Sequence, residues 1–124
     1  MTPESAPSST DLNQLDQWSY HRVLDDVIEP CLVVFTSPAC GSCRALLRAL
    51  PDVPLALIGA RYQIDAARWP GLAEEMAVFH LPAMLLYARG ELVGEVHAPP
   101  RAAALSAAIE ALLSSDPQFE PAQV

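Results

Sequence analysis

The chain has 124 residues, of which 52% are hydrophobic and 18% are charged. This length and apolar content suffice for one buried core and exclude an intrinsically disordered chain. A net charge of -8 disfavours nucleic acid and anionic membranes as partners. All seven basic residues are arginines, which also excludes mechanisms that need a catalytic lysine.

The cysteine count and the N-terminal segment bear on the compartment. Three cysteines are too few, and odd in number, for a disulfide-stapled secreted scaffold. The first eleven residues carry Glu4 and lack the apolar segment of a signal peptide. The longest apolar runs are far shorter than the roughly 20 residues that cross a bilayer. We therefore expect a soluble, cytoplasmic protein.

Composition also suggests where the domain lies. Residues 1–10 are rich in Ser, Thr and Pro, and residues 114–124 contain two prolines without helical or strand periodicity. Both segments are expected to be mobile tails. Because no repeat or low-complexity linker interrupts the rest, one domain is expected over residues 11–113.

The first predicted elements are a helix, a strand and a second helix. Apolar residues recur at helical spacing over residues 19–28, with Ser19 placed as an N-cap. Residues 31–35 form a continuous apolar run, which is typical of a central parallel strand buried on both faces. Residues 40–50 have one apolar face and are predicted to form a helix that Pro51 ends.

The next predicted elements are a strand, a helix and a hairpin. Residues 55–58 are interpreted as a second buried strand, and residues 70–79 as a short helix with proline in its first turn. Two further strands over residues 84–87 and 92–96 are separated by a short turn, in which Gly90 can adopt positive φ.

A final amphipathic helix is predicted over residues 99–113. The order is then helix, strand, helix, strand, helix, hairpin, helix. Right-handed crossovers would make the first half of the sheet parallel, and the hairpin would make the second half antiparallel. The fold class is therefore α/β, with a central mixed sheet flanked by helices on both faces.

The chemical feature of the sequence is the motif Cys40-Gly41-Ser42-Cys43, at the point where a buried strand turns into a helix. A sulfur at a helix start lies beside unpaired backbone N–H groups and the positive end of the helix dipole, which stabilises a thiolate. Cys40 is therefore predicted to be the more acidic and more exposed thiol. Cys43 faces the core and can close a disulfide with it, so thiolate attack, mixed disulfide and resolution are the expected chemistry.

Two other interpretations of the cysteine pair stay open. The same spacing suits half of a structural zinc site, and some C-x-x-C pairs are inert. Zinc would need two more ligands, and Cys31, His21, His80 and His97 form no second closely spaced pair. We therefore predict dithiol redox chemistry, with no metal and no cofactor besides the cysteine pair itself.

Several features in register resemble the thioredoxin family over about residues 11–113. They are the run CLVVFTSPACGSC over residues 31–43, the strand end Gln63-Ile64-Asp65, the Leu81-Pro82 step before MLLYARGELVGEV, and the final amphipathic helix.

The resemblance implies a thioredoxin-like fold and a thiol-disulfide oxidoreductase that acts on protein disulfides or dithiols. Cys40 would be the nucleophile and Cys43 the resolving thiol. Pro82 would be cis and stand beside the pair, with the backbone before it, at Leu81, against the substrate chain. Gly41 and Ser42 would border the same groove. An NADPH-linked reductase is the implied electron source if the protein works as a reductant.

The chain departs from the family at several positions. Ala39 and Ser42 replace the tryptophan and proline of the usual Trp-Cys-Gly-Pro-Cys, and Ser42 is expected to favour the thiolate and a more oxidising disulfide. Val34 stands where the family carries a buried acid, and Arg61 where it carries a lysine. Resolution is then expected to be slow, or to use water or another carboxylate.

The positions of several further residues suggest roles for them. His97 and Ala98 lie near the place of a family glycine, where a side chain would narrow the substrate groove. As a neighbouring cation, His97 is also a candidate to lower the pKa of Cys40. Asp65 and His97 are candidates to supply the missing base. Cys31 is interpreted as a small buried hydrophobic residue.

Trp18 and Trp69 are interpreted as packing anchors outside the motif. The missing acid and tryptophan leave a second functional hypothesis open: a thioredoxin-like binding or chaperone module that uses the groove without turnover.

Overall fold

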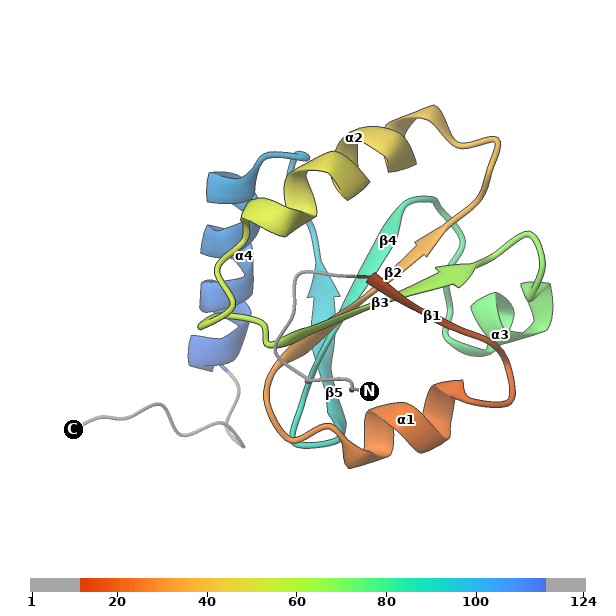
Figure 1. Ribbon diagram of the computed structural model, residues 1–124, viewed down its shortest axis with the longest axis horizontal. Coiled ribbons are helices and arrows are strands. Elements are labelled where there is room, and N and C mark those ends of the chain that lie inside the picture. The colour runs from red at the N-terminus through yellow and green to blue at the C-terminus, as the bar shows by residue number, and fades with distance from the viewer. Residues whose placement is uncertain (1–11, 116–124) are drawn as a thin grey trace, which may run out of the picture.

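The structure is a computed structural model that describes residues 12–115. Within these residues, five strands form one mixed sheet in the order β1-β3-β2-β4-β5 (Figure 1). The strands are β1 (Leu12–Leu15), β2 (Cys31–Thr36), β3 (Ala60–Asp65), β4 (Ala83–Ala88) and β5 (Glu91–Val96). The helices are α1 (Tyr20–Asp26), α2 (Gly41–Ala49), the short 3-10 helix η1 (Leu50–Asp52), α3 (Pro70–Glu75) and α4 (Ala102–Ser115).

The central strand β2 joins the two halves of the sheet. It runs parallel to β3, which is in turn parallel to β1, and it runs antiparallel to β4, which forms a hairpin with β5. All six residues of β2 are buried. The structure therefore confirms the predicted α/β class, with a mixed sheet made of a parallel half and an antiparallel hairpin.

Helices cover both faces of the sheet (Figure 1). Side chains of α1 and α3 pack with Val33 and Phe35 of β2 in one hydrophobic cluster. Side chains of α2 and α4 pack with Leu32 and Val34 in the other. Successive residues of a strand point to opposite faces, so Thr36 at the end of β2 lies on the α2 side with Leu32 and Val34.

The predicted strand over residues 55–58 is wrong. This segment forms a turn in which the Pro54 carbonyl accepts hydrogen bonds from the backbone N–H groups of Leu57 and Ile58. The strand follows instead at Ala60–Asp65. The sequence of β3 does not show the apolar pattern of a buried strand, because Arg61 is polar yet completely buried.

Other boundaries also differ from the sequence prediction. Strand β1 was not predicted, because four residues are too few for a periodic signal. Ser19 precedes α1 but makes no side-chain cap; Asp16 Oδ1 accepts instead from the N–H of Ser19 at 2.9 Å. Helix α4 continues to Ser115, into the expected C-terminal tail, while the remainder of both expected tails lies outside the described residues.

The hairpin between β4 and β5 confirms the predicted turn. Arg89 and Gly90 have φ angles of 56° and 75°. Two successive residues of positive φ suit the right-handed twist of a two-residue hairpin. A Cβ on Gly90 would lie 2.7 Å from the Asp25 carbonyl oxygen, so this position also requires glycine for space. No helix in residues 12–115 is long and apolar enough to cross a membrane.

Candidate active site

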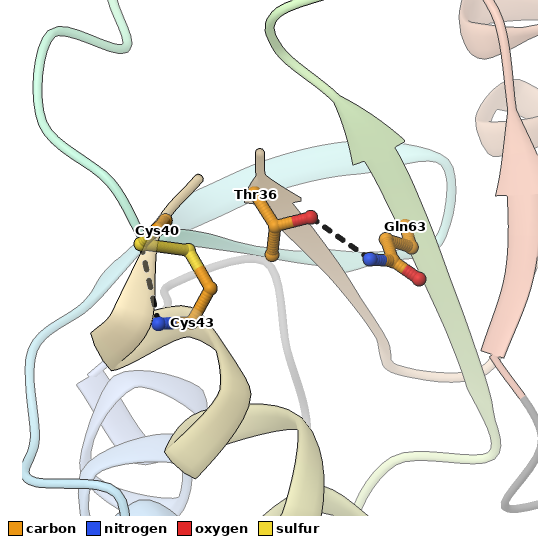
Figure 2. Close-up of a disulfide and its surroundings, with 4 residues drawn as sticks. All are labelled: Thr36, Cys40, Cys43 and Gln63. Atoms are coloured by element: carbon orange, nitrogen blue, oxygen red, sulfur yellow. Dashed lines mark hydrogen bonds between the residues drawn. A yellow bond between two sulfur atoms is a disulfide. The ribbon is translucent and has the colours of Figure 1, made fainter. Parts of the chain in front are cut away.

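The two motif cysteines lie at the start of α2, immediately after the turn that follows β2. They form a disulfide with their Cα atoms 5.3 Å apart. Cys40 is the N-cap residue, and its Sγ accepts a hydrogen bond from the backbone N–H of Cys43 at 3.2 Å (Figure 2). The first sulfur therefore sits where a free helix N–H can stabilise negative charge.

The two sulfurs differ in burial. Cys43 is only 1% exposed, whereas Cys40 is partly exposed at the surface. A thiol that meets a macromolecular substrate must be accessible, and Cys40 is the more accessible thiol of the pair. This difference in exposure is the one expected from the sequence.

A cavity of about 290 Å³ lies on one side of the cysteine motif. Ser42 and Pro82 line it, together with His97 and Glu95 from the end of β5. The Leu81–Pro82 peptide bond is cis, as the family resemblance implies. The cavity adjoins the cysteine motif through Ser42, and a surface hollow of this size can hold a segment of extended chain.

Not all the predicted groove residues meet in this cavity. Leu81 lines a separate hollow with Phe79, and Gly41 is exposed at the helix start. His97 does border the cavity, but its side chain is 79% exposed and its Nε2 lies 3.8 Å from Glu95 Oε1. The ring thus lies exposed beside a carboxylate, and among the described residues no hydrogen bond joins it to either cysteine.

A second cavity, of about 270 Å³, lies on the other side of the disulfide. Both cysteines line it, and so do Thr36, Gln63 and Asp65. Asp65 was predicted as a candidate tuning residue. Its Oδ1 accepts from the N–H groups of the two residues at positions 67 and 68, so part of its carboxylate holds the turn after β3.

A family model described as Thioredoxin matches residues 11–111. The chain belongs to the thioredoxin family. No curated protein sequence matches it.

Solved structures show the same fold. Mitochondrial thioredoxin 3 from Saccharomyces cerevisiae, oxidised form, is 20% identical, with a TM-score of 0.68 over 81% of this chain and 94% of that one. A structure concerning the thiol resolving mechanism in yeast mitochondrial 1-Cys peroxiredoxin via glutathione/thioredoxin systems is 20% identical, with a TM-score of 0.69 over 84% and 98%. Human ERp44, form II, is 17% identical, with a TM-score of 0.72 over 94% of this chain but only 34% of that one. These likenesses establish a thioredoxin fold.

Two departures from the family pattern can now be placed. Val34 is completely buried and lies between Gln63 of β3 and Met84 of β4, so an apolar side chain occupies the position of the family's buried acid. Arg61, in place of the family's lysine, is also completely buried. Its guanidinium donates to the carbonyl oxygens of Leu50, Val53 and Ile58. Arg61 therefore holds the segment after α2 and is not directed at the sulfurs.

Burial lowers the pKa of Arg61, and its Nε has no hydrogen-bond partner among the described residues. The side chain is nevertheless placed to neutralise three carbonyl dipoles in a dry environment. A buried charge of this kind is tolerated only when its hydrogen bonds are largely made.

Cys31 lies far from this chemistry. It is completely buried on the α1 side of β2 and takes no part in the disulfide. Burial, with a smaller contribution from the negative charge of Glu29, raises the pKa of Cys31 to about 12. The interpretation of Cys31 as a buried hydrophobic residue is confirmed.

The two tryptophans do not share one role. Trp69 is partly buried and packs against the core, as predicted. Trp18 is 69% exposed and touches Trp69 edge-to-face, with ring centroids 5.0 Å apart, so its interpretation as a packing anchor is wrong. The exposed position follows from the turn before α1, which carries Trp18 outside the helix face that packs on the sheet.

The described residues offer no ligand set for the structural zinc site considered above. In residues 12–115, no group of three or more His, Cys, Asp or Glu side chains is arranged to hold a metal ion. His21 is instead paired with Glu75 at 2.8 Å, which links α1 to α3.

The sequence reasoning missed Thr36 and Gln63. Gln63 Nε2 donates to Thr36 Oγ1 at 2.8 Å beside the disulfide (Figure 2). The available signal was a threonine that ends an otherwise apolar strand four residues before Cys40.

Proposed function

We propose that this protein is a thiol-disulfide oxidoreductase that acts on protein disulfides through Cys40 and Cys43. The observation that carries the proposal is the asymmetric pair at the start of α2. Cys40 is partly exposed and receives a helix N–H, while Cys43 lies beneath it at disulfide distance. Membership of the thioredoxin family supports the same chemistry.

The reductive half of the cycle has two steps. The Cys40 thiolate attacks one sulfur of a substrate disulfide, which forms a mixed disulfide and releases the other substrate sulfur as a thiolate. Cys43 then loses its proton and attacks Cys40 Sγ. The bond between Cys40 and the substrate breaks, the Cys40–Cys43 disulfide forms, and the second substrate sulfur leaves as a thiolate that takes up a proton. The substrate gains two electrons.

The cavity lined by Ser42 and Pro82 would hold the substrate chain during attack. The redox equivalents reside in the cysteine pair, so the proposal includes no separate cofactor. An NADPH-linked reductase is the proposed electron source for a reductive cycle, and the reducing cytoplasm is the proposed compartment.

Insulin reduction in the presence of dithiothreitol tests the proposal, because the freed insulin B chain precipitates. The wild-type protein should accelerate precipitation well above the dithiothreitol background, and Cys40→Ser should abolish the acceleration. Cys31→Ala is the matched control and should retain it, because Cys31 is remote from the pair.

The second hypothesis, a binding module without turnover, makes the opposite prediction. The wild-type protein and Cys40→Ser would then give the same background rate. That result would overturn the proposed activity.

A further inference from the structure

A row of polar side chains leads from the surface to the back of the disulfide. Gln14, on the edge strand β1, is exposed, and its Nε2 donates to Gln63 Oε1 at 2.7 Å. Gln63 Nε2 donates in turn to Thr36 Oγ1 at 2.8 Å. Thr36, at the inner end of the row, is only 4% exposed.

These bonds turn the proton of the Thr36 hydroxyl away from Gln63. Because the oxygen of the Gln63 amide is occupied by Gln14, its NH₂ group is turned toward Thr36. Thr36 Oγ1 accepts this bond, so its own proton must point elsewhere. Among residues 12–115, that proton has no protein acceptor.

The cavity behind the disulfide offers the missing acceptor. Thr36, Cys40 and Cys43 line the same cavity of about 270 Å³, and Thr36 lies between the disulfide and Gln63 (Figure 2). Water in the cavity can accept the proton of the Thr36 hydroxyl, but a thiolate is a stronger acceptor than water. In the disulfide both sulfurs are neutral, so the demand for a donor arises only after reduction.

We propose that the Thr36 hydroxyl donates a hydrogen bond to Sγ of Cys43 in the reduced protein and so stabilises the thiolate that resolves the mixed disulfide. This inference rests on the proposed function. With that bond formed in the reduced protein, Thr36 would contact a reacting atom as a catalytic residue, whereas Gln63 would act through Thr36 as a positioning residue.

The proposed hydrogen bond stabilises the negative charge on Cys43 Sγ, and the Thr36 hydroxyl does not itself accept the Cys43 proton. Cys43 releases its proton to water in the cavity, Cys43 Sγ attacks Cys40 Sγ, and the substrate sulfur leaves and is protonated. Thr36 keeps its own proton throughout. Since Val34, on the same face of β2, offers no carboxylate, Thr36 is the polar group that this strand presents to the cavity.

The size of the effect can be worked out from hydrogen bonding to charged groups. Loss of one such bond should raise the pKa of Cys43 by about 1 to 2. The thiolate fraction at neutral pH would then fall about 10- to 100-fold. A more basic thiolate is also a better nucleophile, with a Brønsted coefficient of about 0.4–0.5, so the net slowing of resolution is about 3- to 10-fold.

Stopped-flow reaction of the reduced protein with excess dithiobis(nitrobenzoate) separates attack by Cys40 from resolution by Cys43. Attack by Cys40 releases one thionitrobenzoate and leaves a second on Cys40, and resolution by Cys43 releases the second. Thr36→Val preserves shape and removes the hydroxyl. Thr36→Val should leave the rate of the first phase unchanged and slow the second phase about 3- to 10-fold at pH 7. The pH profile of the second phase should move upward by about 1 to 2 pH units.

Two further variants separate hydrogen bonding from packing. Thr36→Ser retains the hydroxyl and should restore the second phase toward the wild-type rate and pH profile. Gln63→Met removes the bond that directs the hydroxyl and should shift the profile in the same direction as Thr36→Val, by less. An unchanged first phase shows that each variant is folded.

A second phase in Thr36→Val with the wild-type rate and pH profile would overturn the inference. So would a slow second phase whose pH profile does not move, because that is the signature of altered packing alone. Failure of the proposed function looks different: the wild-type protein would then not accelerate insulin reduction above the background of Cys40→Ser, whatever the two thionitrobenzoate phases show.

Discussion

Substitution of Val34 by aspartate should destabilise the protein in a pH-dependent way. Val34 is completely buried between Gln63 and Met84, and the amide of Gln63 is already bound to Thr36. While the introduced carboxyl is neutral, burial of this polar group should lower the free energy of unfolding by about 1 to 3 kcal/mol. The loss should grow at higher pH, when the group must ionise in a dry environment.

The direction of this pH dependence of stability follows from proton binding. Burial raises the pKa of the introduced carboxyl above its ordinary value of about 3.9. The folded state then holds the proton to higher pH than the unfolded state, so stability falls as pH rises between the two pKa values. Each unit by which the pKa is raised adds about 1.4 kcal/mol of destabilisation above the folded-state pKa.

Urea unfolding of the oxidised protein at pH 5 and pH 9 measures this effect. Val34→Asn is the matched control, because its side chain has the same shape and does not ionise. The difference in free energy of unfolding between Val34→Asp and Val34→Asn should be larger at pH 9 than at pH 5. Equal differences at the two pH values would mean that water solvates the site, and the reasoning from a dry core would be refuted.

The same substitution should accelerate resolution. A carboxylate at the family's acid position can accept the Cys43 proton, and general-base assistance of this kind is worth on the order of a hundredfold. The second thionitrobenzoate phase of Val34→Asp should therefore be faster than in the wild-type protein above the pKa of the introduced carboxyl, with the first phase unchanged. Resolution in the wild-type protein that already matches attack at pH 7, with no gain in the variant, would show that no added base is needed.

Three further predictions follow from the site and the core. In the reduced protein at neutral pH, iodoacetamide should modify Cys40 first, because a helix N–H stabilises its thiolate and Cys40 is partly exposed whereas Cys43 is buried; faster labelling of Cys43 would contradict this assignment. Cys31, with its pKa raised to about 12 by burial, should stay unmodified in the folded protein even at pH 9, and peptide mapping by mass spectrometry would reveal any labelling. Arg61→Met should lower the free energy of unfolding in urea by about 3 kcal/mol, and more than Arg61→Lys, because three buried carbonyls lose a charged donor; equal losses would show that the positive charge contributes nothing and would contradict this reasoning.

The sequence predicted those parts of the fold whose signals are local. An unbroken apolar run identified β2, the C-x-x-C spacing placed the cysteine pair at a helix start, and a glycine turn placed the final hairpin. The fold class follows from the order of these elements. The same local reasoning separated the exposed from the buried thiol.

The errors arose where distant contacts decide the structure. Strand β3 was misplaced because Arg61 reads as a surface residue, and only the carbonyls of the segment after α2 make its burial favourable. The polar row behind the disulfide depends on the register of β1, β2 and β3, which brings Gln14 and Gln63 opposite each other and Thr36 within reach. Neither the contacts of Arg61 nor the hydrogen bonds of this polar row produce a periodic pattern in the sequence.

Trapping of the mixed disulfide tests the central claim most directly. In Cys43→Ser the resolving thiol is removed, so reaction of the reduced variant with a disulfide-bonded protein should stop after attack. The account predicts a stable adduct in which mass spectrometry finds the substrate linked to Cys40, with Cys31 free. An adduct on Cys31, or no adduct although the variant is folded, would contradict it.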